Sequence, residues 1–210
     1  IQLCKSGGLF GLEPLSEYLA SQLAACLCPE SVRYDLGFYH GALVSKCPLF
    51  TSEQYGLAKA AVFTKDRTVS GFLRFFESIG SGDAFRRMCI LDALILNIDR
   101  HSGNFGVLYS NDTLQVQKMA PVFDNNRSLL FQFDTEALEK NSAWCISKCE
   151  PRVGGDFIKT AQAMLTDDLR AELKNMAGIR FKEPENIDVP KDRLDALSKI
   201  FNLQLNKILK

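Results

Sequence analysis

The sequence has few of the features that would assign it to a class at once. It contains only two histidines among 210 residues, and its longest apolar stretch, CILDALILNI, is interrupted by Asp92 and is too short to span a bilayer. Twenty-five Lys and Arg residues balance 25 Asp and Glu residues, so no excess charge favours nucleic acid or an anionic membrane. No signal peptide is evident. We therefore expect no membrane partner and no direct nucleic-acid partner.

Cysteine is present, but not in a pattern that organises a fold. The seven cysteines are an odd number, they are scattered through apolar segments, and both histidines lie far from any pair of them. A disulfide framework is usually denser and even-numbered, and a structural zinc site needs closely spaced ligand pairs. Reduced, mostly buried thiols are typical of a cytoplasmic protein.

Apolar residues make up 46% of the chain and charged residues 24%, which is ordinary for a globular protein with a substantial core. The first part reads as strand, helix, strand, strand. IQLCK has strand character, SGGLFG is a flexible joint, and leucines recur at spacings of three and four from Leu12 to Leu27, with Pro14 tolerated in the first turn of that helix. Two strands joined by a short turn follow over 31–39 and 42–50.

The second part is mainly helical. Short helices and loops are expected over 51–82, and a long helix over 83–98 with Asp83 as its cap. A strand, a tight turn and a second strand follow over 105–124. From about 156 onward two amphipathic helices, separated by a Pro-containing joint at 182–190, complete an α+β arrangement.

One insert carries the chemistry. LILNIDRHSGNFGVL, at 94–108, interrupts two apolar runs with ionisable side chains. Asp99 and Asn104 fit D-x4-N, and Asp124 ends the second strand of the following hairpin. In phosphoryl transfer, an Asp accepts the proton of the acceptor hydroxyl, while an Asn and a second Asp hold Mg²⁺. The alternative is a surface turn, since Asn and Asp beside Gly are common turn formers. The coincidence of helix end, hairpin and second Asp favours catalysis.

These segments resemble the HipA-like serine/threonine kinases, whose loop reads N-x-D-x-H-x-x-N and whose metal-binding Asp follows a short aP-x-x-D strand. The first pattern is filled by Asn97, Asp99, His101 and Asn104, and the second by Ala120, Pro121 and Asp124. The Asp-Arg-His order is also similar to phosphatidylinositol 3- and 4-kinases. The resemblance implies that Asp99 is the catalytic base, that Asn104 and Asp124 are catalytic metal ligands, and that Asn97 and His101 shape the loop.

The resemblance extends upstream. It implies that Lys5 holds the α- and β-phosphates of ATP and that Glu17, or alternatively Glu13, aims this lysine. The other reading is that Lys5 is a solvated strand end and that the glutamates lie on a wet helix face. Backbone near the end of the third strand would meet adenine. The implied cofactor-binding residues are therefore Lys5, Glu17, Lys46, Cys47, Leu49 and His101.

The implied architecture is a two-lobed, protein-kinase-like α+β fold. Residues 1–50 would form a truncated, β-rich N-lobe and hinge, and 51–210 a helical C-lobe with the catalytic loop at 97–104. Kinases cover the phosphates with a glycine-rich loop before the lysine strand, and no such loop precedes Lys5 here. The joint SGGLFG follows Lys5 and lacks the P-loop pattern. The chain begins with Ile rather than Met, as a piece of a longer protein would.

The expected function is transfer of the γ-phosphate of ATP, with Mg²⁺, to a Ser or Thr hydroxyl of a protein substrate. The resemblance also implies a bacterial cytoplasmic protein with a toxin–antitoxin role, or an effector that is secreted or delivered to a host. Two alternatives stay open. The chain is a small-molecule or phosphoinositide-type kinase, or it is an inactive nucleotide-binding regulator.

Overall fold

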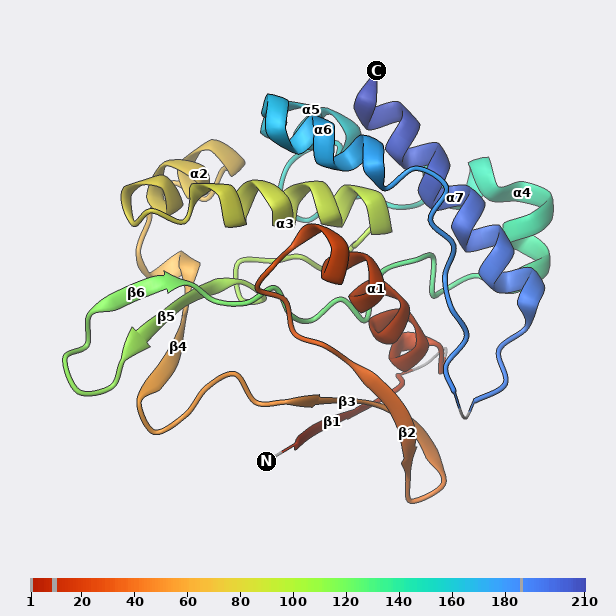
Figure 1. Ribbon diagram of the computed structural model, residues 1–210, viewed down its shortest axis with the longest axis horizontal. Helices are drawn as coiled ribbons and strands as arrows, with labels where there is room; N and C mark the ends of the chain where they lie inside the picture. Colours follow the sequence, from red (N-terminus) through yellow and green to blue (C-terminus); the bar gives the residue numbers. More distant parts are fainter. Residues whose placement is uncertain (1, 9–10, 186) are drawn as a thin grey trace.

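The computed structural model describes residues 2–8, 11–185 and 187–210 (Figure 1). Two three-stranded antiparallel sheets are accompanied by seven α-helices and a 3₁₀-helix in these residues. The first sheet has the order β1-β3-β2 and consists of β1 Gln2–Ser6, β2 Asp35–Tyr39 and β3 Ala42–Pro48. The second has the order β4-β5-β6 and consists of β4 Tyr55–Lys59, β5 Gly106–Ser110 and β6 Val116–Met119. The helices are α1 Glu13–Leu27, η1 Ala60–Val62, α2 Val69–Ser78, α3 Gly82–Ile95, α4 Thr135–Ser147, α5 Phe157–Met164, α6 Asp167–Asn175 and α7 Lys191–Leu209.

Helix α1 lies between the first sheet and α3 (Figure 1). The leucines of its predicted stripe from Leu15 to Leu27 are buried, whereas Leu12 precedes the helix and is only partly buried. Pro14 occupies the first turn, where the missing amide donor costs no helical hydrogen bond. Strand β1 pairs with β3 so that Lys5 lies opposite Ser45. The predicted strand–helix–strand–strand order is confirmed, although Ile1 and residues 9–10 of the predicted joint lie outside the described residues.

Helix α3 forms the centre of the second part and contacts α1, α2, α5 and α7. Its Phe85, Ile90, Leu91 and Ile95 side chains are completely buried. Phe85 of α3 packs with two phenylalanines of α2 and with Phe105 before β5, and the ring centroids of the contacting pairs lie 4.9–6.3 Å apart: Phe72, Phe76, Phe85 and Phe105. This apolar body fixes the position at which α3 ends and the predicted catalytic loop begins.

Three details of the predicted secondary structure were wrong. Strand β4 lies in the stretch 51–82 that was expected to hold only short helices and loops, because it pairs with β5 about 50 residues further along the chain. Helix α4 precedes the helical region expected from 156. Helix α3 begins at Gly82 after Ser81, so Asp83 is not its cap; the Asp83 carboxylate instead lies 2.6 Å from Nε of Arg87.

The remaining composition-based expectations concern the membrane and the thiols. Among the described residues, no helix combines the length and the apolar character needed to cross a bilayer. All seven cysteines are free. Burial raises the pKa of the Cys28 thiol to about 12, which keeps it protonated and unreactive at neutral pH.

Candidate active site

Three charged side chains that lie far apart in the sequence meet at one point. Nζ of Lys5 in β1 lies 2.7 Å from Oδ1 of Asp124 and 3.1 Å from Oε2 of Glu17 in α1. Burial by itself lowers the pKa of Lys5, but the two carboxylates outweigh it and raise that pKa above the ordinary lysine value. The strand, the helix and the segment after β6 are thus joined by one ammonium group.

Glu17 connects this lysine to the backbone as well. Its side chain is completely buried, and its second carboxylate oxygen accepts a hydrogen bond of 2.7 Å from the N–H of Asn125. Burial raises the pKa of Glu17, and the positive charge of Lys5 only partly offsets that rise. The structure places Glu17, and not Glu13, at Lys5; the Glu13 side chain lies against Gly8, where an added β-carbon would come 2.8 Å from Glu13 Oε1.

Asp124 has a backbone conformation that few non-glycine residues adopt. Its φ of 60° lies in the left-handed region, which Asp tolerates better than most residues. Its N–H donates to the hydroxyl of Tyr34 at 3.3 Å, and Nζ of Lys5 lies 5.6 Å from the centre of the Tyr34 ring. The chain therefore turns sharply at Asp124, with its carboxylate beside Lys5.

The predicted catalytic loop begins where α3 stops. Leu96 is left-handed, with φ of 53°, and ends the helix. Asn97 then holds the loop by donating to Asp92 and accepting from the N–H of Asp99, both at 3.0 Å. Further along, Nδ1 of His101 accepts from the N–H of Gly103 at 3.0 Å. Asn97 and His101 thus shape the backbone around Asp99.

The five-residue step from Asp99 to Asn104 closes on itself. The side-chain amide of Asn104 donates to the backbone carbonyl of Asp99 at 3.1 Å, and only 8% of Asn104 is exposed. That hydrogen bond uses the nitrogen of the amide and leaves its oxygen without a protein donor among the described residues. An amide oxygen and the Asp124 carboxylate are the kinds of ligand that Mg²⁺ takes, with phosphate and water completing its shell. The two residues therefore fit the predicted metal role in their donor chemistry.

Arg100 joins the loop to the segment that carries Asp124. Its guanidinium, which is nearly completely buried, is paired with Asp92 at 3.0 Å. It also donates to the backbone carbonyls of Asn104 at 3.0 Å and Phe123 at 2.5 Å, and to the Asn125 side chain at 2.5 Å. These bonds hold Asn104 and Asp124 in one region. Two features of the sequence could have indicated this ion pair. Asp92 is a charged residue inside the apolar run of α3, and Arg100 stands inside the predicted catalytic loop between Asp99 and His101.

Asp99 has a different set of neighbours from Asp124. Its side chain is 18% exposed and lies 3.0 Å from Nε of Arg152 and 3.8 Å from Nε of Arg127. Arg127 follows Asp124 by three residues, and its carbonyl accepts from the N–H of Ile98 at 3.1 Å. Arg152 lies in the loop between α4 and α5. Sequence reasoning named neither arginine.

The three residues predicted to lie near adenine occupy different environments. Lys46 has strand neighbours on both sides, Cys4 and Asp35, and its side chain lies over Gly37. Cys47 is buried on the face of β3 that Ser45 shares, and it packs with Val32 and Tyr34. Leu49 follows the end of β3 and is 44% exposed. Their adenine contact stays a prediction.

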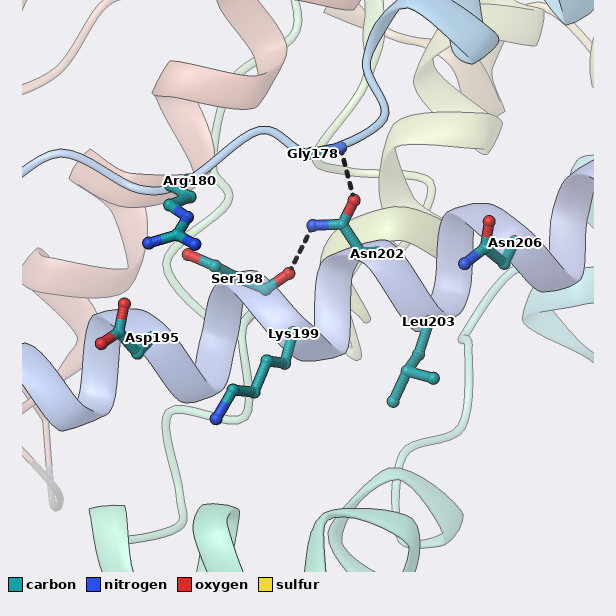
Figure 2. A pocket seen from close by; sticks show the side chains of 8 residues that line it. All are labelled: Gly178, Arg180, Asp195, Ser198, Lys199, Asn202, Leu203 and Asn206. Carbon is teal, nitrogen blue, oxygen red and sulfur yellow. Dashed lines mark hydrogen bonds between the residues drawn. The ribbon is translucent and has the colours of Figure 1, made fainter.

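A large cavity of about 560 Å³ lies elsewhere, along one side of α7 (Figure 2). It contains none of the predicted site residues. Asn202, one of its lining residues, accepts a hydrogen bond from the N–H of Gly178 and donates one to the carbonyl of Ser198, both at 2.8 Å. The candidate active site is thus defined by converging side chains and not by the volume of this cavity.

Comparison with known proteins adds an independent finding. No family model matches the chain. The chain is 28% identical, over 210 aligned positions, to the serine/threonine-protein kinase CtkA of Helicobacter pylori (strain J99 / ATCC 700824), with 92% of this chain covered. It spans 61% of the length of that relative. The crystal structure of a Helicobacter pylori proinflammatory kinase CtkA superposes with a TM-score of 0.72 at 18% identity, covering 99% of this chain and 87% of the other. The predicted kinase-like α+β fold is confirmed, and the chain is similar in sequence to a serine/threonine-protein kinase.

Proposed function

We propose that this chain, a relative of a serine/threonine-protein kinase with a matching fold, transfers the γ-phosphate of ATP to a Ser or Thr hydroxyl of a protein. The observation that carries the proposal is the convergence of Lys5, Glu17 and Asp124, with Nζ of Lys5 within 3.1 Å of both carboxylates. In the alternative interpretation, Lys5 is a solvated strand end and Glu17 lies on an exposed helix face. That interpretation predicts an exposed Glu17, whereas Glu17 is completely buried.

The charges suggest how nucleotide and metal are held. Lys5 would bind the α- and β-phosphates, and Asp124 and Asn104 would bind Mg²⁺, which supplies positive charge to the phosphates when present. Lys5 and Asp124 now neutralise each other. Binding would exchange this pair, because Asp124 gains the metal and Lys5 gains the phosphates while Glu17 continues to orient the lysine.

Asp99 would act on the acceptor. We assign it the role of accepting the hydroxyl proton as the new O–P bond forms, with the bond to the β-phosphate oxygen breaking and ADP leaving. Asn97 and His101 support this role by fixing the loop backbone. Backbone around Lys46, Cys47 and Leu49 would contact adenine. With a partial N-lobe at 1–50 and a C-lobe at 51–210, these groups would lie at the junction of the two lobes.

The biological setting is also a proposal. The structurally similar kinase CtkA comes from the bacterium Helicobacter pylori and is called a proinflammatory kinase. This description supports a role as a bacterial effector for the present chain, in preference to a toxin–antitoxin role. The phosphorylated protein is not identified by either comparison.

The test is transfer of labelled phosphate. The chain is incubated with ATP, Mg²⁺ and a lysate, and label is recovered separately from protein, lipid and small molecules. We expect label in protein and a fall of about 10²- to 10⁴-fold in Asp99→Asn, because the proton acceptor is lost. Asp112→Asn, in an exposed hairpin turn, is the matched control and should be active. Label in lipid or metabolites indicates the alternative kinase class, and no label in any fraction indicates a nucleotide-binding regulator.

A further inference from the structure

The two arginines beside Asp99 need an explanation that the transfer mechanism does not supply. Arg152 and Arg127 are 55% and 51% exposed, and each approaches Asp99 through Nε at 3.0 and 3.8 Å. Ion pairs of such exposed side chains contribute little to stability. The pairs are therefore weak enough for another anion to compete for the two arginines.

Both guanidinium groups have free donors. Among the described residues, neither side chain has any other ion pair or hydrogen-bond partner, so the terminal Nη groups are without protein partners there. A planar guanidinium with two free donors binds a carboxylate in a bidentate manner. The pair therefore offers a site for an anionic group immediately beside Asp99.

The backbone is anchored at Arg127, whereas Arg152 lies in a loop that contains two glycines. Arg127 is anchored next to the catalytic loop by the hydrogen bond from the N–H of Ile98. Arg152 lies in a loop followed by Gly154, with φ of 85°, and Gly155, which has open space where a side chain would be. One arginine is thus fixed, and the other is on a segment whose backbone can adjust to a ligand.

The position of the site distinguishes the possible anions. In the proposed function the phosphates of ATP have a cationic partner in Lys5, which is 25% exposed and lies against Asp124. Arg127 and Arg152 lie at the other carboxylate, Asp99, where the acceptor hydroxyl would arrive. An anion bound there would belong to the protein substrate.

We propose that Arg127 and Arg152 form a subsite for an acidic residue next to the acceptor Ser or Thr of the protein substrate. The substrate carboxylate binds the free donors of both arginines, and this contact places the acceptor hydroxyl next to Asp99. This inference rests on the proposed kinase function and adds the class of substrate to it.

The experiment uses two peptide pools with a single Ser: one with Glu at the flanking positions and one with Gln. We expect kcat/KM for the Glu pool to exceed that for the Gln pool by at least about tenfold, as for charge-assisted hydrogen bonds. Arg127→Ala and Arg152→Ala should reduce this ratio, mainly through KM, and the double variant should abolish it. Arg74→Ala, which removes another exposed and ion-paired arginine, is the control and should keep the ratio.

A binding measurement separates failure of this inference from failure of the kinase assignment. Fluorescence anisotropy is measured with a Glu-flanked peptide whose Ser is replaced by Ala, so no transfer is required. Salt-sensitive binding that is lost in the double variant, and a shift of preference to Lys-flanked peptide in Arg152→Glu, support the subsite even if no phosphate is transferred. Equal binding of Glu and Gln peptides, or equal loss of kcat for both pools in the arginine variants, overturns it.

Discussion

Two ion pairs in the candidate active site differ in how deeply they are buried and in how many of their hydrogen-bonding groups have protein partners. Arg100 and Asp92 are nearly inaccessible, and Arg100 has additional protein acceptors on the catalytic loop and on the segment before Asp124. Lys5 and Asp124 are each 25% exposed, and Oδ2 of Asp124 has no protein donor among the described residues. The first pair has no capacity left for a ligand, whereas the second can exchange its partners for one.

This difference separates scaffold from chemistry. A buried pair is costly to form and costlier to break, because removal of one partner leaves a charge in a low dielectric. Burial already raises the pKa of Asp92 against the opposing charge of Arg100. A partly exposed pair can open, since water and ligand can replace either partner. We therefore expect Arg100 to determine stability and loop position, and Lys5 and Asp124 to determine ligand binding.

The largest expected effect is that of Arg100→Met. The variant leaves Asp92 buried without its cation and frees the carbonyls of Asn104 and Phe123. We expect the free energy of unfolding to fall by about 3–5 kcal/mol, measured by urea denaturation. Adding Asp92→Leu should recover part of the loss, because the uncompensated charge is removed.

Arg74→Met is the control for this change, because Arg74 forms an exposed pair with Asp66. It should have little effect on the denaturation midpoint. An Arg100→Met protein as stable as the control would show that the buried network is not a scaffold, and the contrast between the two pairs would disappear.

A smaller effect is expected from Asp124→Asn, and only in the presence of ligand. Without nucleotide the variant should unfold near the normal midpoint, since the Lys5–Asp124 pair is partly solvated and Lys5 keeps Glu17. A free MgATP concentration of 100 times the dissociation constant raises the free energy of unfolding of a binding protein by about 2.7 kcal/mol. We expect thermal denaturation to show this gain in the unmodified chain and to show it reduced in Asp124→Asn at the same MgATP concentration.

Magnesium titration sharpens the same test. If Asp124 is a metal ligand, the variant should need more Mg²⁺ for any given stabilisation by ATP. An identical Mg²⁺ dependence in the two proteins would assign Asp124 to a purely structural pairing with Lys5. In that case Asp124, like Asp92, would serve only to pair with a cation of the protein.

The sequence predicted the residues that follow a local spacing. Asn97, Asp99, His101 and Asn104 lie within one turn-like loop, so their mutual contacts depend on a few backbone angles. The Lys5–Glu17 contact was accessible through the resemblance to kinases, because a strand followed by an amphipathic helix restricts which glutamate can face the lysine. Glu13 and Glu17 remained alternatives until the helix was placed on the sheet.

Other features depend on contacts that no local pattern encodes. Strand β4 exists because it pairs with β5, which follows it only after η1, α2 and α3, and this tertiary pairing outweighs the weak strand propensity of its five residues. The bonds from Arg100 to residues 123 and 125 require the hairpin to be folded. Arg152 reaches Asp99 from a loop 53 positions away in the numbering, after α4 has packed against α7.

The smallest expected effect concerns the pH dependence of stability and involves Glu17. Burial raises its pKa above the unfolded value of 4.5, so between that value and its folded pKa the folded state binds more protons than the unfolded state. Stability contributed by this group is therefore present below pH 4.5 and is lost as the pH rises through the folded pKa. Glu17→Gln lacks this titration but keeps a side chain that can accept from the Asn125 N–H.

The measurement is the free energy of unfolding of both proteins across pH 4 to 7, with the difference between them plotted. The stability of the unmodified chain relative to Glu17→Gln should decline as the pH rises from 4.5. An increase would mean that Lys5 outweighs burial and holds Glu17 ionised, as in an exposed pair. Because Glu17 contacts both Lys5 and the segment after Asp124, the sign of this slope tells whether the centre of the site behaves like the buried Asp92–Arg100 pair or like the exchangeable one.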